Sequence, residues 1–410
     1  MTGAADRFLP YARQSVDEDD VAAVVQVLRG DYLTTGPMSA RFEATLAETT
    51  GARHVVVCSS GTAALHLAAL GLRLGEGDAV IVPAITFLAT ANAARYVGAE
   101  AIFADVDPAT GLMGPEHLEA ALARSGSLRP RAVFPVHLAG QCVDTAGIKA
   151  VAVRHGLRIV EDACHALGGR HRATGGGWVP VGSCKDSDAA AFSFHPVKTV
   201  AMGEGGAVAT NDPVLAEAAR RLRSPGMVSG DAATANPGLA RDAAGTFNPW
   251  YYEMPEVGFN FRASDIHCAL GLSQIKKMSD WVLRRRALVD RYAAALASLA
   301  PVVRPIGKVA WSETAWHLAV VLIDFDAVGT TRARVMAHLR ERGIGSQVHY
   351  IPLHWQPYYA KRYGALGLPG AETYYARCLS LPLFPTLDDA DVDRVVATLA
   401  EALGLAGRRA

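Results

Sequence analysis

The chain has 410 residues, half of them hydrophobic, and its 40 basic and 40 acidic residues balance to a formal net charge of zero. A chain of this length can bury a large core, and we expect two subdomains rather than one. The balanced charge predicts no nucleic-acid partner, and the lack of a long apolar run predicts no membrane span.

The first fifty residues predict two helices joined by a turn. The chain begins MTGAADRFLP, which has neither an apolar signal core nor an arginine-rich transit pattern, so we expect a cytoplasmic protein. Ser15 and Glu18 have the spacing of a capping box in front of DVAAVVQVLRG, a helix that can end at its glycine. DYLTTGP, over 31–37, then predicts a turn, and Pro37 can start a second helix that runs to about Thr50.

Short apolar runs recur through the first half of the chain, and helical patterns separate most of the earlier ones. These runs predict strands over residues 55–58, 79–83, 101–105, 132–136, 158–161, 189–194 and 206–210. Strands that alternate with helices are typical of a mainly parallel sheet covered on both faces. The predicted fold class is therefore α/β.

The C-terminal part of the chain predicts longer helices and a smaller unit. Its expected elements are a long helix over 264–299, a strand over 317–323, and helices over 331–342 and from 388 to the end. We therefore divide the chain into an N-terminal arm with a large domain, 1–260, and a linker helix with a small domain, 261–410. Residues 224–249 are rich in glycine, proline and alanine and predict a long mobile loop.

A strand, a turn of small residues and a helix follow one another in HVVVCSSGTAALHLAALGL, residues 54–72, with Gly61 and Thr62 in the turn. The first turn of such a helix presents free backbone N–H groups and a partial positive charge, which suit a phosphate. Ser193, on a predicted strand, offers a further hydroxyl. The alternative is an ordinary strand-to-helix turn with a serine or threonine N-cap. The turn is not a P-loop, because no lysine follows the glycine at the required position.

Lys198 lies in the segment AAAFSFHPVKTVAMGEGGAVAT, residues 189–210, in a short polar turn between two predicted strands. A lysine held in such a place can act as a covalent catalyst if its amine meets a carbonyl carbon. Gly203, Gly205 and Gly206 follow it and would let the backbone approach a bulky planar ligand closely.

Glu161 and Asp162 end the predicted strand in RIVEDACHALGG. An acid at the carboxyl end of a strand lies where open α/β sheets bind their ligands. A lysine for a Schiff base and an acid for a pyridinium nitrogen together indicate pyridoxal 5′-phosphate as the cofactor. Taken singly, a loop lysine is usually a solvated charge, and an acidic pair after a strand is usually a helix cap or turn former. Their combination with the phosphate turn favours catalysis.

The cysteines carry no sign of a disulfide framework or of a metal site. There are six, Cys58, Cys142, Cys164, Cys184, Cys268 and Cys378, with no C-x-x-C pair and no metal-ligand spacing. We therefore expect reduced cysteines in the core and no bound metal.

Motifs along nearly the whole chain resemble those of the DegT/DnrJ/EryC1/StrS family of sugar aminotransferases. They are PYARQSVDEDD, LRGDYLTTGP, SSGTAALHLA, PAITFLATANAA, VEDACHALGG, VGSCKDSD, FSFHPVKTVAMGEGGAV, WYYEMPEVGFNFRASDIHCALGLSQIKK, VHYIPLHWQPYY and LSLPLFPTL. The resemblance implies the type I aspartate-aminotransferase fold, with a mainly parallel central sheet in a large domain and a small α+β C-terminal domain. Within the family, FHPVK, WYYEM and YIPLH are most similar to the UDP-4-amino-4,6-dideoxy-N-acetyl-β-L-altrosamine transaminases of pseudaminic acid biosynthesis.

The resemblance implies roles for four residues around the cofactor ring. Lys198 corresponds to the lysine that forms the Schiff base and later shuttles a proton, and Asp162 to the acid that keeps the pyridine nitrogen protonated. His165 corresponds to the residue that lines the ring and its hydroxyl. Phe87 corresponds to an aromatic residue that stacks on the ring, with a core phenylalanine as the alternative.

For the cofactor phosphate, the resemblance implies Gly61, Thr62 and Ser193 as binding residues. Asn260, in GFNFR, corresponds to a residue that reaches the phosphate from the neighbouring subunit. The resemblance therefore implies a homodimer with active sites at the subunit interface. Without it, Asn260 would be an ordinary turn residue.

Side chains for a sugar-nucleotide substrate are expected in HYIPLHWQPYY, where His349, Tyr350 and His354 can hydrogen-bond hydroxyls and a diphosphate. The alternative is that this segment is an aromatic loop that closes the small domain. Thr35, in the TTGP turn, would lie near the active site in the family's fold.

The resemblance implies an enzyme that moves the amino group of L-glutamate to the C4 ketone of a UDP-linked 4-keto-6-deoxy-N-acetylhexose, by a ping-pong reaction through pyridoxamine phosphate. Three alternatives stay open: an acceptor that is another keto-sugar or a keto-cyclitol, a 3-dehydratase of the same fold, and a non-catalytic scaffold. In the dehydratases histidine replaces the lysine, so Lys198 argues against that alternative. HRATGGGWVP, over 171–180, is longer than the family pattern and predicts an extended hairpin near the site.

Overall fold

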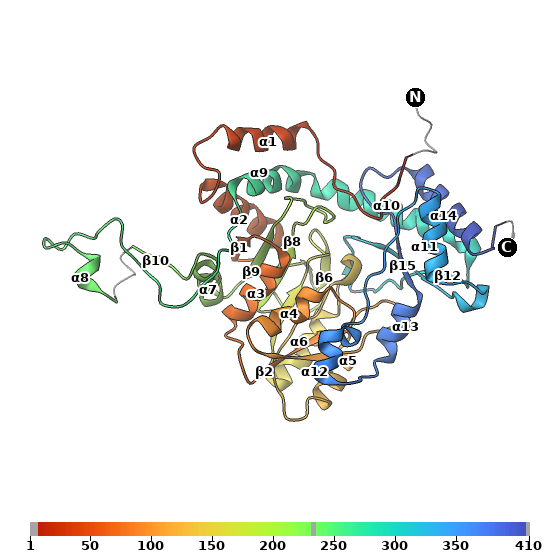
Figure 1. Ribbon diagram of the computed structural model, residues 1–410, viewed down its shortest axis with the longest axis horizontal. Helices are drawn as coiled ribbons and strands as arrows, with labels where there is room; N and C mark the ends of the chain where they lie inside the picture. The colour runs from red at the N-terminus through yellow and green to blue at the C-terminus, as the bar shows by residue number, and fades with distance from the viewer. Residues whose placement is uncertain (1–6, 231–234, 407–410) are drawn as a thin grey trace.

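The computed structural model describes residues 7–230 and 235–406, and at its centre lies a seven-stranded sheet (Figure 1). In spatial order the strands are β1 His54–Cys58, β9 Gly206–Thr210, β8 Ala189–Ser193, β5 Arg158–Asp162, β4 Arg129–Val133, β2 Asp78–Pro83 and β3 Glu100–Ala104. β9 runs antiparallel to β1 and β8, and the other neighbouring pairs of this sheet are parallel. The predicted α/β class with a mainly parallel sheet is confirmed.

Side chains of this sheet alternate between two separate hydrophobic cores. On β1, Val56 and Cys58 face the core that contains residues of α3 Gly61–Gly71 and α4 Leu88–Tyr96. Val55 and Val57 face the other core, with residues of α2 Pro37–Thr50. Because both faces are covered, most of these strands are largely apolar, which accounts for the continuous apolar runs in the sequence.

Helices of the first half connect and cover the strands. Besides α2, α3 and α4, they are α1 Glu18–Leu28, α5 Pro115–Ala123, α6 Thr145–His155 and α7 Pro213–Arg223. The predicted capping box on Ser15 is wrong, because Asp17 caps α1 and Asp20 accepts a hydrogen bond from the Asp17 amide in return. Both pairs have the same three-residue spacing, and the Ser15 carbonyl instead accepts from the Gln274 side chain (2.8 Å).

The single long helix predicted over 264–299 is also wrong. The chain forms α9 Asp265–Gln274 and α10 Met278–Leu296, joined by a 3₁₀ turn at Ile275–Lys277. At the junction, the Gln274 amide donates to the Asp20 carboxylate (2.6 Å) and to the Ser15 carbonyl. The break therefore lies where the N-terminal segment crosses the helix, as Figure 1 shows for α1 above α9.

A second, three-stranded antiparallel sheet lies in the C-terminal part of the chain. Its strands are β12 Val303–Pro305, β14 Ala319–Ile323 and β15 Cys378–Leu381, and the helices near it are α10, α11 Arg332–Glu341, α13 Pro369–Arg377 and α14 Asp389–Ala402. α12 Pro357–Tyr363 instead lies against β3 of the large sheet, where the Tyr363 hydroxyl accepts from the Ala101 amide (2.9 Å). The final helix ends at Ala402, and residues 407–410 lie outside the described part of the chain. The domain boundary at residue 260 stays a prediction.

The extended hairpin predicted over 171–180 is present as β6 Arg170–Arg172 and β7 Trp178–Pro180. A third short strand, β13 Ser312–Glu313, pairs with β6. The hairpin is therefore connected to the C-terminal part of the chain rather than free in solvent.

The segment over 224–249 extends from the body as an arm, seen at the left of Figure 1. Its base is a two-stranded ribbon of β10 Val228–Ser229 and β11 Tyr252–Glu253, and it carries the short helix α8 Pro237–Ala240. The loop predicted here therefore has some regular structure, and residues 231–234 of it lie outside the described residues. Large apolar side chains such as Leu239 are exposed on it.

Over residues 7–230 and 235–406, no helix is both long and apolar enough to cross a membrane. The same residues contain no group of three or more histidine, cysteine, aspartate or glutamate side chains placed to hold a metal ion. All six cysteines are free thiols, and five of them are buried.

Candidate active site

The predicted site residues come together at one edge of the seven-stranded sheet. β1 leads into Gly61, β2 leads into Phe87 and β5 ends at Asp162. β8 ends at Ser193, and Lys198 follows in the connection to β9. Parallel strands have their carboxyl ends at the same edge, which is where α/β sheets bind ligands.

Lys198 lies in a short connection between two antiparallel strands. The connection is closed by a hydrogen bond from the Phe194 amide to the Gly205 oxygen (2.8 Å). Within it, the Lys198 amide donates to the His195 oxygen (2.8 Å), which makes a tight turn. The backbone around the lysine is thus fixed by its own hydrogen bonds.

The Lys198 side chain is half-buried. Burial lowers the pKa of its amine, while the neighbouring Cys164 and Asp162 act in the opposite direction. A larger fraction of this amine is therefore neutral than for an exposed lysine. A neutral amine is what a nucleophile or a general base requires.

Asp162 is buried at the last position of β5, and both of its carboxylate oxygens are hydrogen-bonded. Thr90 Oγ1 donates to Oδ2 (2.7 Å), and the Cys164 amide donates to Oδ1 (3.2 Å). The Asp162 oxygen accepts from the His137 amide (3.1 Å), which continues the parallel pairing past the end of β4. The carboxylate is fixed in orientation and lies close enough to Lys198 for its charge to act on that amine.

Glu161 lies next to Asp162 but serves a different structure. Its carboxylate is fully buried, 2.7 Å from His137 Nε2, and it accepts from the Ser187 hydroxyl. Burial alone would raise the pKa of Glu161. The hydrogen bond and charge of His137, helped by His171 and Ser187, outweigh burial and lower the pKa of Glu161 to about 2. Successive strand residues point to opposite faces of the sheet, so the Glu161–His137 pair lies on the other face from the Asp162 side chain.

Replacing Glu161 with alanine is expected to lower the free energy of unfolding by about 3–5 kcal/mol, because His137 is left without its buried partner. The contribution is present above the ordinary pKa of 4.5 and is lost as the pH falls toward about 2, where the folded carboxyl takes up its proton. Urea unfolding of the unchanged protein and of Glu161→Ala over this pH range should show that the difference between their free energies of unfolding shrinks toward acid pH. A difference that stays constant would contradict this role for the ion pair.

The rings of Tyr350, His165 and Phe87 lie close to one another. Tyr350 Oη lies 3.2 Å from His165 Nε2, and the ring centroids of Tyr350 and Phe87 are 6.0 Å apart. The Phe87 side chain is 54% exposed, so the alternative of a core phenylalanine is wrong. Tyr350, expected to contact the substrate, lies against a residue expected to line the cofactor.

Two further histidines lie around Lys198, and the sequence patterns did not indicate the first of them. His317 is buried with its ring centroid 4.5 Å from that of His165. Burial lowers the pKa of His165 and His317 well below its usual range, and the charge of Lys198 acts in the same direction. His349 Nδ1 lies 2.8 Å from Ser380 Oγ, and burial together with Lys198 lowers the pKa of His349 to about 3.

These buried imidazoles leave polar atoms unused. Within the described residues, Nδ1 of His165 and Nδ1 of His317 are buried and have no hydrogen-bond partner. Buried polar groups of this kind are normally satisfied, so each of the two atoms is available to hydrogen-bond a polar group that the protein does not itself supply.

The N-terminus of α3 meets the end of β8 in a close contact between small residues. Ser60 caps the helix by accepting from a backbone amide of the first turn (3.1 Å), so the amides of Gly61 and Thr62 have no acceptor within the helix. A Cβ at Gly61 would lie 2.8 Å from Ser193 Cβ, and one at Gly206 would lie 2.2 Å from the Ser60 oxygen. An anion at this point would meet two free amides, a hydroxyl and the positive end of a helix.

The contacts of three predicted residues lead away from Lys198. Asn260 is exposed. The carbonyl oxygen of the next residue, Phe261, accepts from the amide of Ser59 (2.7 Å), near the start of α3. Thr35 is exposed, and its hydroxyl donates to the neighbouring Thr34 oxygen (2.7 Å). His354, predicted as a substrate residue, is buried with Nε2 3.6 Å from Glu372 Oε1, on α13.

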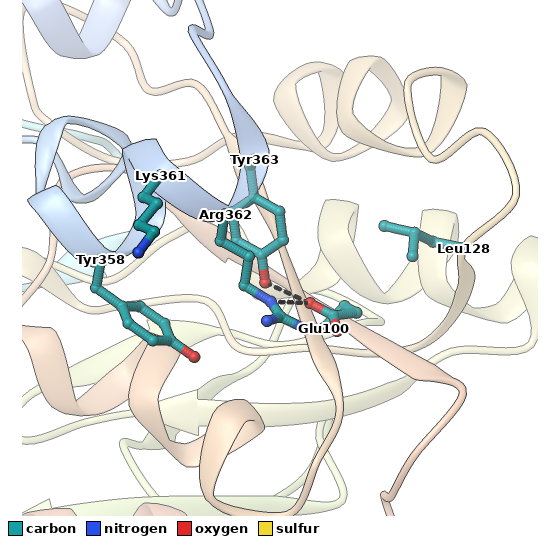
Figure 2. Close-up of a pocket in the computed structure, with 6 residues that line it drawn as sticks. All are labelled: Glu100, Leu128, Tyr358, Lys361, Arg362 and Tyr363. Carbon is teal, nitrogen blue, oxygen red and sulfur yellow. Dashed lines mark hydrogen bonds and ion pairs between the residues drawn. The ribbon is translucent and has the colours of Figure 1, made fainter.

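A hollow of about 680 Å³ lies elsewhere, beside the edge strand β3 (Figure 2). It is lined by Glu100, Leu128, Tyr358, Lys361, Arg362 and Tyr363. Glu100 accepts hydrogen bonds from Arg362 and Tyr363 (2.8 Å each). These hydrogen bonds, the one from Arg362 above all, lower the pKa of Glu100 to about 2. This carboxylate is already paired, and the lining includes none of the predicted site residues.

The residues at the sheet edge fit pyridoxal 5′-phosphate. Lys198 offers an amine of lowered pKa for its aldehyde, and Asp162 offers a fixed carboxylate for its ring nitrogen. The unpartnered Nδ1 of His165 suits a polar substituent of the ring, and the free amides of α3 suit the phosphate.

Comparisons with known proteins agree over the whole length of the chain. Residues 14–400 match the DegT/DnrJ/EryC1/StrS aminotransferase family. The spore coat polysaccharide biosynthesis protein SpsC of Bacillus subtilis (strain 168) is 37% identical over 408 residues, which are 98% of this chain and 98% of that protein.

Solved structures show the same relationship. Helicobacter pylori PseC, an aminotransferase involved in the biosynthesis of pseudoaminic acid, is 28% identical with a TM-score of 0.86, covering 97% of this chain and 100% of that chain. Spr1654 of Streptococcus pneumoniae is 27% identical, with TM-scores of 0.84 for its PMP form and 0.83 for its PLP form, each covering 97% of this chain and 99% of that chain. The chain belongs to the DegT/DnrJ/EryC1/StrS aminotransferase family and is a pyridoxal-phosphate-dependent sugar aminotransferase.

Proposed function

We propose that this enzyme transfers the amino group of L-glutamate to the C4 ketone of a UDP-linked 4-keto-6-deoxy-N-acetylhexose, in a pathway of the pseudaminic acid type. The observation that carries the proposal is the half-buried Lys198 amine of lowered pKa, held beside the fixed Asp162 carboxylate. The choice of sugar is supported by the similarity to PseC over nearly the whole of both chains.

When bound, the cofactor supplies an aldehyde that accepts the amino group and a ring that takes up an electron pair. In the proposed mechanism, Lys198 Nζ removes the proton from the donor carbon that carries the amino group and delivers a proton in the second half-reaction. Asp162 holds a negative charge at the ring nitrogen, and His165 and Phe87 line the ring. Tyr350 positions His165 through the contact between its hydroxyl and Nε2.

The proposed phosphate site consists of the Gly61 and Thr62 amides and the Ser193 hydroxyl, gathered where α3 meets β8. Asn260, exposed in the single chain, would complete the phosphate site of a second copy. The proposal therefore includes a homodimer in which each subunit contributes to the other's site.

For the sugar nucleotide, we retain Thr35, on an exposed turn, as a substrate contact. We assign His349 and Tyr350 to the cofactor side, because the charge of Lys198 acts on His349 and Tyr350 contacts His165. His354 is left out of the site, because its ring is buried against Glu372.

The acceptor can be tested by mixing the pyridoxamine form of the purified enzyme with a panel of nucleotide-linked 4-keto-sugars. The UDP-linked 4-keto-6-deoxy-N-acetylhexose is expected to restore the absorption of the aldehyde form fastest, because the reaction is ping-pong and each half can be followed alone. L-Glutamate should in turn restore the pyridoxamine form.

A faster reaction with a keto-cyclitol, or with a keto-sugar on another nucleotide, would contradict the proposed substrate and leave the enzyme class unchanged. A sugar panel without any reaction, in an enzyme that still binds the cofactor, would contradict the proposed acceptor.

A further inference from the structure

Two buried threonines form a hydroxyl chain that ends on Asp162. Thr86 and Thr90 are four residues apart around the start of α4, and their Oγ1 atoms lie 2.8 Å apart. Thr90 Oγ1 then reaches Asp162 Oδ2 at 2.7 Å. Thr86 is 1% and Thr90 0% exposed, so bulk water does not compete for either hydroxyl.

The chain has one direction when Asp162 is ionised. A carboxylate can only accept, so the Thr90 hydroxyl must donate to it. The Thr90 oxygen is then free to accept, and Thr86 is the hydroxyl that lies within reach to donate. Both protons of the chain therefore point toward Asp162, and hydrogen bonds polarised in series strengthen one another.

We propose that Thr90, supported by Thr86, is the positioning residue that fixes the orientation of the Asp162 carboxylate toward the cofactor ring. The inference rests on the role proposed above for Asp162. The Cys164 amide holds the other oxygen at 3.2 Å, so Thr90 makes the shorter of these two contacts. A neutral valine of the same shape at position 90 would leave Oδ2 buried without this donor.

The test compares Thr90→Val, Thr90→Ser and Thr86→Val with the unchanged enzyme. Thr90→Val is expected to raise the dissociation constant for pyridoxal 5′-phosphate by about 10- to 100-fold and to lower kcat by a similar factor. This is the range for a lost hydrogen bond to a charged group. Thr90→Ser keeps the hydroxyl and should recover most of both, whereas Thr86→Val should give a smaller loss. KM for the sugar should change little.

A second readout does not depend on turnover. The pH titration of the visible absorption of the bound cofactor is expected to shift its midpoint upward in Thr90→Val, because a ring nitrogen that is protonated less of the time withdraws less charge. Thr398→Val is the matched control, since Thr398 is also buried but its hydroxyl donates to the Arg394 oxygen of its own helix (2.8 Å).

Unchanged affinity and unchanged titration in Thr90→Val would overturn the proposal, as would a Thr90→Ser enzyme as impaired as the valine variant. If Thr90→Val does not fold, Thr86→Val decides: a weakened cofactor affinity supports the proposal, and an unchanged one overturns it. Failure of the sugar assignment is distinguishable, because cofactor affinity and absorption are measured without any sugar.

Discussion

Lys198→Ala is expected to lower kcat for the amino transfer by at least about 10³-fold, because it removes the amine that we propose both links to the cofactor and carries the proton. Single-turnover measurements with L-glutamate would report the chemical step, and the visible absorption of the bound cofactor should lose the contribution of the lysine-linked form.

Lys185→Ala is a matched control for this experiment. Lys185 is exposed and lies in the segment just before β8, so its removal deletes a positive charge without reaching the site. The control should turn over like the unchanged enzyme. Added methylamine should restore part of the rate of Lys198→Ala, because a small amine can take over the proton transfer. Full speed in Lys198→Ala without any added amine would refute the proposed role of this lysine.

The strands of the central sheet could be predicted because their signal is local. A strand buried on both faces is apolar at nearly every position, and each predicted run overlaps a strand of the sheet. The ends of the strands were harder to predict: the strand predicted over 132–136 is β4 Arg129–Val133, which begins and ends three residues earlier. There the pairing with β2 starts at Arg129, and the polar residues that begin β4 carry no apolar signal.

The errors in the helices arise from contacts between distant residues. Ile275–Lys277 contains no proline or glycine, so nothing in its composition indicates a break between α9 and α10. The break coincides with the contacts of Gln274 to the N-terminal segment, which no local pattern encodes. The cap of α1 was misassigned because Asp17 and Ser15 offer the same spacing to their partners.

At the site, the order of the strands decided what could be predicted. Residues that follow strand ends, such as Asp162 and Ser193, gather at one edge because parallel strands share that edge. Thr90, His137 and His317 were missed, since each acts through a partner far away in the sequence. A buried threonine on a helix carries no signal until the carboxylate that it contacts is known.

Asp162→Asn is expected to lower kcat by at least about 10²-fold while KM for the sugar changes less, because the negative charge that we propose faces the ring nitrogen is replaced by a neutral amide. The substitution keeps the shape of the side chain, so the carbonyl oxygen can still accept from Thr90 or from the Cys164 amide. What is lost is charge, and the bound cofactor should titrate at a different pH from that in the unchanged enzyme.

Asp188→Asn tests whether any loss of charge on these strands has the same effect. Asp188 accepts from the Ile159 amide (2.7 Å) and pairs with Arg158 (3.0 Å), at the opposite end of β5 from Asp162. It should leave kcat and the cofactor absorption unchanged. Equal losses in both variants would mean that the sheet, and not the ring nitrogen, needs the charge. A loss confined to Asp162→Asn, together with a shifted titration, would place the required negative charge at the carboxyl end of β5, where the Lys198 amine also lies.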